Sequence, residues 1–128
     1  MAEKMIVNAA GAPPAVGPYN HAVRVGEMLY CSGQIPLDPA DPKAPFPEDV
    51  TAQSERVLKN IGLVLADQSL DYTNVVKCTV FLTDLSDFAA MNAVYQQYFT
   101  ADFPARSTIQ VAGLPLGAKV EIEIIAHY

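Results

Sequence analysis

Two segments of this sequence carry apolar residues at helical spacing along one side only. The first follows Asp49, a suitable N-cap, runs to Gln68-Ser69 without the glycine expected at its end, and has a stripe made of Val50, Val57, Leu58, Ile61, Val64 and Leu65. The second, which Asp84 or Ser86 can cap and which runs to about Thr100, has a stripe made of Phe88, Met91, Tyr95 and Phe99. A helix with a single apolar stripe needs a single apolar surface, so we expect both helices to pack on one sheet.

Five other segments have the composition of strands. They are 22–25 and 28–32, which a turn at Gly26-Glu27 would join into a hairpin, then 75–82, 105–111 and 119–126. The last segment alternates cleanly, with Val120, Ile122, Ile124 and Ala126 on one side and Lys119, Glu121 and Glu123 on the other. The proline-rich segment 36–47 is expected to be a surface loop within one domain that spans residues 1–128.

The order of these segments, β-β-α-β-α-β-β, predicts an α+β fold, a two-layer sandwich with both helices on one face of the sheet. The other face is expected to carry Arg106, Thr108, Glu121 and Glu123 together with several apolar side chains. Such a face is not easily left open to water, so we expect it to pack against another subunit. A hydrophobic content of 51% with 17% charged residues also favours an oligomer.

The formal charge of −6, from 8 basic and 14 acidic residues with no basic cluster, argues against binding to nucleic acid or to an anionic membrane surface. The apolar runs are too short to span a bilayer, and no secretory signal follows Lys4, so we expect a cytoplasmic protein. Cys31 and Cys78 do not have the spacing of a disulfide framework or a zinc site, and we expect them to be buried free thiols. His21 and His127 are isolated, and no metal site is expected.

Arg106 is the charge whose position is most informative. Pro104 disfavours helix in the residue before it, so a strand is expected to begin there, with Arg106 at its entrance on a polar row with Thr108 and Gln110. A guanidinium is a rigid fork of donors that suits a carboxylate or a phosphate. By itself, this segment favours an ordinary salt bridge, with ligand binding as the alternative.

Glu121 lies on the next strand along the chain, and we expect the two strands to pair with Arg106 and Glu121 on matching faces. The two residues would then form either a cross-strand salt bridge or a site in which Arg106 holds a carboxylate and Glu121 handles a water or a proton. Asn92, at the edge of an apolar stripe, needs either a helix–sheet hydrogen bond or a ligand. Cys31 has no base nearby in the sequence, so a structural role is preferred to a nucleophilic one.

Several groups of residues, in order along the chain, resemble the pattern of the RidA (YjgF/YabJ) family. They are Gly17-Pro18-Tyr19, Ser32-Gly33-Gln34-Ile35-Pro36, Val76-Lys77 with Thr79-Val80-Phe81, Asp87-Phe88 with Asn92 and Tyr95, Phe103-Pro104-Ala105-Arg106-Ser107, Leu114-Pro115 and Val120-Glu121-Ile122-Glu123. The match runs from about Asn8 to Ala126. The sequence departs from the family pattern at Asn20-His21, at Ser69 and at Thr108, where many members have cysteine.

The resemblance implies a chorismate-mutase-like fold assembled as a homotrimer, with the sheets facing the trimer interior and ligand pockets between subunits. It implies a 2-iminobutanoate/2-iminopropanoate deaminase of the RidA subgroup, an enzyme that hydrolyses 2-aminoacrylate and related imines to 2-ketoacids and ammonia and requires no cofactor. Carried over from the family, the site residues are Arg106 for the substrate carboxylate, Glu121 for the attacking water, and Tyr19, Ser32, Gly33, Asn92 and Thr108 for the lining of the pocket.

Two other functions are alternatives to the enzyme. The first is a non-catalytic module whose pockets sense a ketoacid or another small carboxylate and regulate a partner. The second is the endoribonuclease or translation-inhibitor activity that has been attached to members of the family, which the net charge of −6 disfavours.

Overall fold

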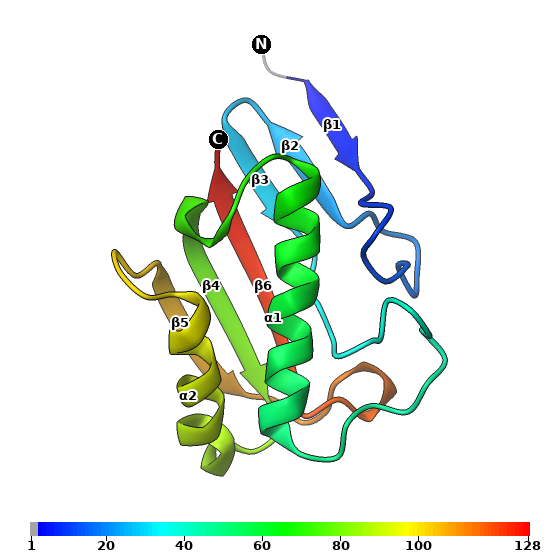
Figure 1. Cartoon of the computed structure of the whole chain (residues 1–128), viewed down its shortest axis with the longest axis vertical. Helices are drawn as coiled ribbons and strands as arrows, with labels where there is room; N and C mark the ends of the chain where they lie inside the picture. The colour runs from blue at the N-terminus through cyan, green and yellow to red at the C-terminus, as the bar shows by residue number, and fades with distance from the viewer. Residues whose placement is uncertain (1–2) are drawn as a thin grey trace.

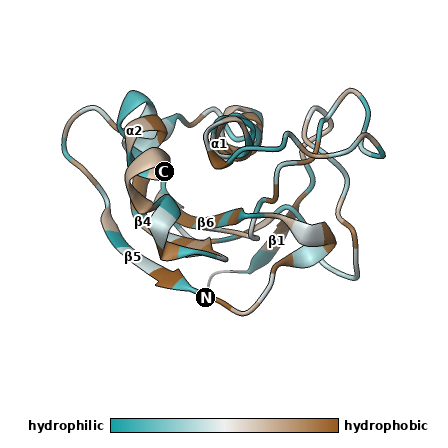
Figure 2. Ribbon diagram, turned by 90° about the horizontal axis from the view of Figure 1, so that it is seen from below, coloured by the Kyte–Doolittle hydropathy of each residue, from teal (hydrophilic) through white to brown (hydrophobic). Residues whose placement is uncertain are grey.

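The computed structural model of the chain describes residues 3–128 and consists of a six-stranded mixed sheet with two helices on one of its faces (Figures 1 and 2). The strands are β1 (Lys4–Val7), β2 (Ala22–Val25), β3 (Met28–Cys31), β4 (Val75–Leu82), β5 (Ala105–Gln110) and β6 (Val120–His127). The helices are α1 (Val50–Asp67) and α2 (Phe88–Tyr98). The α+β sandwich expected from the order of the segments is therefore confirmed.

One strand, β1, was not predicted from the sequence. β1 pairs antiparallel with β2 at the edge of the sheet, with Val7 opposite Ala22. Only Val7 of its residues is buried, and Lys4, Met5 and Ile6 are exposed, so this short segment has no alternation of buried and polar residues by which to find it.

The core forms where the apolar stripe of α1 packs on the helix-facing side of β4 and β6. All six stripe residues named for the first helix are buried, and Val80, Ile122 and Ala126 face them from the sheet. Of the second stripe, Met91 and Tyr95 in α2 and Phe99 directly after it are buried, but Phe88 is 40% exposed. Phe88 is the first residue of α2 and reaches toward β5 rather than into the core, as its contact with Arg106 shows.

The ends of α1 are fixed by polar groups. The Asp49 carboxylate accepts the Ala52 N–H at 2.7 Å, as expected for an N-cap. Gln53 is buried, and its carboxamide donates to the Pro47 carbonyl at 2.8 Å and accepts the Lys119 N–H at 2.8 Å. At the other end, Ser69 adopts a φ of 58°, the left-handed conformation for which the sequence analysis expected a glycine.

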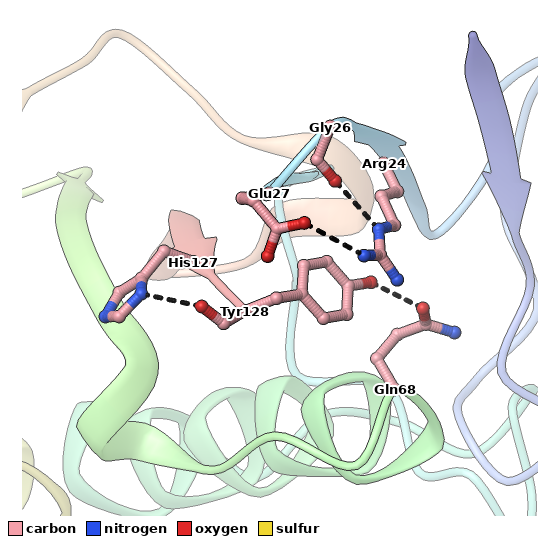
Figure 3. A network of polar contacts seen from close by, with 6 residues as sticks. All are labelled: Arg24, Gly26, Glu27, Gln68, His127 and Tyr128. Atoms are coloured by element: carbon pink, nitrogen blue, oxygen red, sulfur yellow. Dashed lines mark hydrogen bonds and ion pairs between the residues drawn. The ribbon is translucent and has the colours of Figure 1, made fainter. Parts of the chain in front are cut away.

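A second polar network ties the β2–β3 hairpin to the end of β6 and the end of α1 (Figure 3). The Arg24 guanidinium lies 3.6 Å from the centre of the Tyr128 ring, pairs with Glu27 at 3.7 Å and donates from Nε to the Gly26 carbonyl at 2.9 Å. The Tyr128 hydroxyl donates to Gln68 Oε1 at 2.5 Å.

The strand order β1-β2-β3-β6-β4-β5 corrects the expected pairing of the last two strands. β5 and β6 do not pair, because β4 lies between them, parallel to β5 and antiparallel to β6. A parallel pair requires a crossover, and α2 provides it between β4 and β5. The edge position of β5 follows from this connection.

The register also corrects the expected composition of the open face. Arg106 lies beside Cys78 and Thr108 beside Val80, and both partners are fully buried under the helices. Arg106 and Thr108 therefore face the helix layer, whereas Glu121, paired with Phe81, and Glu123 face away from it. The open face keeps Glu121, Glu123 and Lys77 among exposed apolar side chains, which include Ile6, Val25, Tyr30 and Ile109.

Replacing Gln53 by Ala is expected to destabilise the fold by about 1 to 3 kcal/mol, because it leaves the Lys119 N–H and the Pro47 carbonyl without their partner. Urea unfolding of the variant beside wild type measures the change. Gln97→Ala, at an exposed position of α2, is the control and should shift stability by less than about 0.5 kcal/mol. Equal stability of Gln53→Ala and wild type would contradict the role given to this bridge.

Candidate active site

Arg106 enters β5 one residue after the strand begins, and its guanidinium lies against α2. Its Cζ atom is 4.6 Å from the centre of the Tyr95 ring and 5.5 Å from that of Phe88. Within residues 3–128, the Arg24–Glu27 contact is the single ion pair, so no carboxylate of the described chain neutralises Arg106. The intramolecular salt bridge favoured by the local sequence is absent, and the guanidinium is left able to bind an anion.

A cavity of about 320 Å³ opens beside this guanidinium. It is lined by Asn92, Tyr95 and Gln96 of α2 together with Phe103, Pro104 and Arg106. The Asn92 Oδ1 atom is buried and has no hydrogen-bond partner, so the helix–sheet hydrogen bond considered for this residue is not formed through that atom. The cavity combines one cation with one unused acceptor, the polarity that suits a small carboxylic acid with an N–H group.

Thr108 lies on the same face of β5 as Arg106, two residues further along. Its Oγ1 atom is also buried without a hydrogen-bond partner. It is adjacent to the cavity and does not line it. The structure thus groups Arg106, Asn92 and Thr108 between β5 and α2.

Glu121 is placed by a glycine. A Cβ atom added to Gly33 would lie 1.9 Å from Glu121 Oε2, so the carboxylate occupies the space that any other residue at position 33 would fill. The backbone of Gln34 holds this contact, because its N–H donates to the Ile122 carbonyl at 2.9 Å and its carbonyl accepts the Ile122 N–H at 3.2 Å. Burial, and secondarily the Glu123 carboxylate, raise the pKa of the Glu121 carboxyl.

Ser32 and Tyr19 lie in the segments that lead to this glycine. The Ser32 hydroxyl donates to the Asn20 carbonyl at 2.6 Å, and the Ser32 N–H donates to the His21 carbonyl at 3.0 Å. The Tyr19 ring is 44% exposed, and its hydroxyl accepts the Val16 N–H at 3.2 Å. The structure thus brings Ser32, Gly33 and Glu121 together through the strand ends and joins the Tyr19 segment to them.

The two groups of residues do not share one pocket of a single chain. Arg106 is on the helix-covered face at the edge strand, and Glu121 is on the open face two strands away. The expected cross-strand pair of Arg106 and Glu121 is therefore wrong for one chain.

The remaining candidate groups are occupied or inert. His21 is buried, and its Nδ1 accepts the Ala9 N–H at 2.9 Å, whereas His127 is exposed. Burial raises the pKa of the Cys31 thiol to about 12 and also raises that of Cys78, so neither is a thiolate near neutral pH. Cys78 is buried as expected, while Cys31 is only partly so.

Other parts of the described chain offer less chemistry. A second cavity, of about 570 Å³, lies against the outer side of α1, and none of the site residues predicted from the sequence lines it. No three His, Cys, Asp or Glu side chains in residues 3–128 come together as metal ligands, and none of the described helices is both long and apolar enough to cross a bilayer.

The aromatic side chains under Arg106 were not predicted as part of the site. Phe88 and Tyr95 were assigned to the apolar stripe of the second helix, although they also form the surface on which the guanidinium rests. Their spacing of seven residues, two helical turns, is the signal that could have placed both on the side facing Arg106. Gln96 and Phe103, which line the cavity, carry no comparable signal.

Comparison with known proteins identifies the family. The family model described as Endoribonuclease L-PSP matches residues 9–128. Over 128 residues the chain is 55% identical to Protein DfrA of Myxococcus xanthus, covering 98% of this chain and 96% of that protein. Over 123 residues it is 49% identical to a 2-iminobutanoate/2-iminopropanoate deaminase of Capra hircus, covering 96% and 89%.

The fold agrees with this similarity in sequence. The crystal structure of E. coli TdcF with bound serine matches the chain with a TM-score of 0.90 at 42% identity, over 97% of this chain and 98% of that one. On the family match, the identities and the common fold together, the chain belongs to the RidA/YjgF/L-PSP family.

Proposed function

We propose that this protein is a deaminase that hydrolyses reactive 2-imino acids and enamines, such as 2-aminoacrylate and 2-iminobutanoate, to 2-ketoacids and ammonia. The observation that carries the proposal is the Arg106 guanidinium, which lies at a small cavity and pairs with no carboxylate among the described residues. The 49% identity to a protein named 2-iminobutanoate/2-iminopropanoate deaminase supports the choice of reaction.

In this proposal Arg106 binds the substrate carboxylate through two parallel N–H donors. Asn92 lines the same cavity, and its Oδ1 atom, which is buried without a hydrogen-bond partner, accepts from the N–H of the imine, while Thr108 supplies a further hydroxyl beside it. A 2-ketoacid product has no N–H at this position, so the cavity favours the substrate over the product. The imine already hydrolyses in water, and the protein needs mainly to orient it.

Glu121 acts on the water. The carboxylate takes a proton from the water as its oxygen bonds to C2 of the imine, and it gives that proton to the nitrogen, which receives the electron pair of the C2–N double bond. In the resulting carbinolamine the hydroxyl proton passes through Glu121 to the nitrogen, the C2–N bond breaks, ammonia leaves, the C2 carbonyl forms and Glu121 is again a carboxylate. A raised pKa brings a carboxylate closer to the basicity that general-base catalysis at neutral pH requires. Ser32 and Tyr19 complete this half of the site, and Gly33 makes room for the Glu121 carboxylate.

Both halves meet in an assembly, which we propose to be a homotrimer with the sheets facing its interior. Arg106 and Glu121 lie on opposite faces of the sheet of one chain, so an active site that needs both takes them from two chains. The exposed side chains of Ile6, Tyr30 and Ile109 on the open face supply apolar surface for such contacts.

A non-catalytic carboxylate-binding module is the second candidate function. It is favoured by the related structure of E. coli TdcF, which holds bound serine, a small molecule with a carboxylate. The same Arg106 cavity would serve this function, with saturable binding of a ketoacid and no turnover as its mark. An endoribonuclease, the description of the family model, is disfavoured by the net charge of −6.

The first test of the enzyme is Arg106→Ala in an assay where a threonine dehydratase generates the imine and ketoacid release is followed. We expect wild type to accelerate release and Arg106→Ala to lose at least about 100-fold in kcat/KM, because an ionic contact to the substrate is removed. Arg56→Ala, on the outer side of α1, is the matched control and should remain active. If wild type leaves the rate of ketoacid release unchanged, the protein is not this deaminase, and the carboxylate-binding module becomes the favoured function.

The rate should fall at low pH as Glu121 takes up a proton and can no longer accept one from water. Because its folded-state pKa is raised, this acid limb should lie above the usual glutamate range. Glu123→Gln removes the carboxylate that contributes to the raised pKa of Glu121, so the acid limb of the rate profile should move to lower pH. Glu121→Gln should abolish the activity. A limb that stays in place in Glu123→Gln would count against Glu121 as the titrating group.

Sharing of the site between chains can be tested by mixing two inactive variants, Arg106→Ala and Glu121→Ala. Unfolded together in equal amounts and refolded, they should regain about one quarter of wild-type activity, the fraction of sites that receive one intact residue from each chain in random trimers. Each variant refolded alone is the control. Absence of any gain, with mixed oligomers present by mass spectrometry, would mean that both residues must come from one chain.

A further inference from the structure

The side chains that lie against the Arg106 guanidinium are aromatic, and none of them is acidic. Cζ of Arg106 lies 4.6 Å from the Tyr95 ring centre, within the range of a cation–π contact, and 5.5 Å from Phe88. No anionic side chain of residues 3–128 pairs with it. The guanidinium is therefore held from one side by π faces, and its N–H groups are not consumed by a carboxylate.

Tyr95 and Phe88 differ in how firmly they are held. Tyr95 is only 6% exposed and stacks at 4.5 Å on Phe99, which is itself buried in the core between α1, α2 and the sheet. Phe88 is 40% exposed at the start of α2. Tyr95 is thus a fixed platform packed into the core, and Phe88 is a partly exposed ring beside it.

Unpartnered polar atoms gather at this platform. Five buried side-chain atoms in residues 3–128 lack a hydrogen-bond partner, and three of them belong to Asn92, Tyr95 and Thr108, around Arg106. Buried polar groups are nearly always paired, so the Asn92 and Thr108 atoms indicate groups that are completed by something bound beside Arg106. Burial also raises the pKa of the Tyr95 phenol, so the ring beside the cation is a neutral phenol and not a phenolate counter-ion.

We propose that Tyr95 is a positioning residue for Arg106: its buried ring holds the guanidinium with its donors turned toward the cavity, ready for a substrate carboxylate. The inference rests on the proposed function of Arg106 and adds a residue whose ring acts through the guanidinium. A free arginine side chain has many rotamers, and holding it in the binding geometry before the substrate arrives removes that entropic cost from binding. Loss of the ring should therefore weaken substrate binding more than it slows the chemical step.

The test compares Tyr95→Leu, Tyr95→Phe and the control Tyr98→Leu in the coupled assay. Tyr98 is also on α2 but contacts Tyr72, at 5.3 Å between ring centres, and not Arg106. Tyr95→Leu should raise KM about tenfold with kcat changed less than about threefold, while Tyr95→Phe, which keeps the ring, and Tyr98→Leu should stay within about threefold of wild type. A wild-type KM in folded Tyr95→Leu overturns the proposal.

A double-mutant cycle separates positioning from a merely structural role. Binding of 2-ketobutanoate is measured by calorimetry for wild type, Tyr95→Leu, Arg106→Ala and the double variant. If Tyr95 acts through Arg106, Tyr95→Leu should weaken binding about tenfold in wild type and leave the residual binding of Arg106→Ala unchanged. An equal loss in both backgrounds overturns the proposal, because the ring would then act independently of the guanidinium.

Two further outcomes keep the result interpretable. If Tyr95→Leu does not fold, Tyr95 can be replaced by pentafluorophenylalanine, whose ring has a similar volume but a face of opposite partial charge. This replacement should raise KM as the leucine does. An unchanged KM overturns the proposal. If Arg106→Ala keeps full activity, the proposed function of Arg106 fails. If Arg106→Ala is inactive while every Tyr95 variant behaves as wild type, only the positioning role fails.

Discussion

The alternation of side chains along three neighbouring strands is the constraint on which the rest of this structure depends. Because α1 and α2 cover only one face of the sheet, each residue of β6, β4 and β5 is assigned either to the core or to the open face. Val80 and Ile122 close the core, Glu121 and Glu123 are turned outward, and Arg106 is turned toward α2 at the sheet edge. The separation of the acid from the cation is thus a consequence of how the core is built.

That separation leaves two charges without an ion-pair partner among residues 3–128. Arg106 rests on Tyr95 and has no counter-ion among the described residues, and Glu121 is half-buried against Gly33 with a raised pKa. Each charge would be costly if it served stability alone, because a partly desolvated charge loses hydration and gains nothing in return. The cost is offset if a substrate carboxylate binds Arg106 and a water binds Glu121. The proposed assembly of chains would bring these two residues to one ligand.

The supports of these charges are rigid, and this rigidity is the link between fold and proposed chemistry. Glu121 is confined by the backbone bridge between Gln34 and Ile122, and Arg106 by a ring that is packed into the core. A reaction that proceeds in water without help asks mainly for orientation of its reactants. Buried backbone and buried aromatic rings supply orientation better than exposed loops do, since fewer conformations are open to them.

The sequence by itself determined the two helices, five of the six strands and the sandwich, because the stripes of α1 and α2 and the alternation in β6 are local patterns with one economical packing. It also singled out Arg106, Glu121 and Asn92, through residue types and a family resemblance. Only the tertiary structure decided that β4 lies between β5 and β6, that Arg106 faces the helices, and that its support is Tyr95. Strand order depends on the path of the α2 crossover, a contact between segments far apart in the chain, and periodicity within one segment carries no information about it.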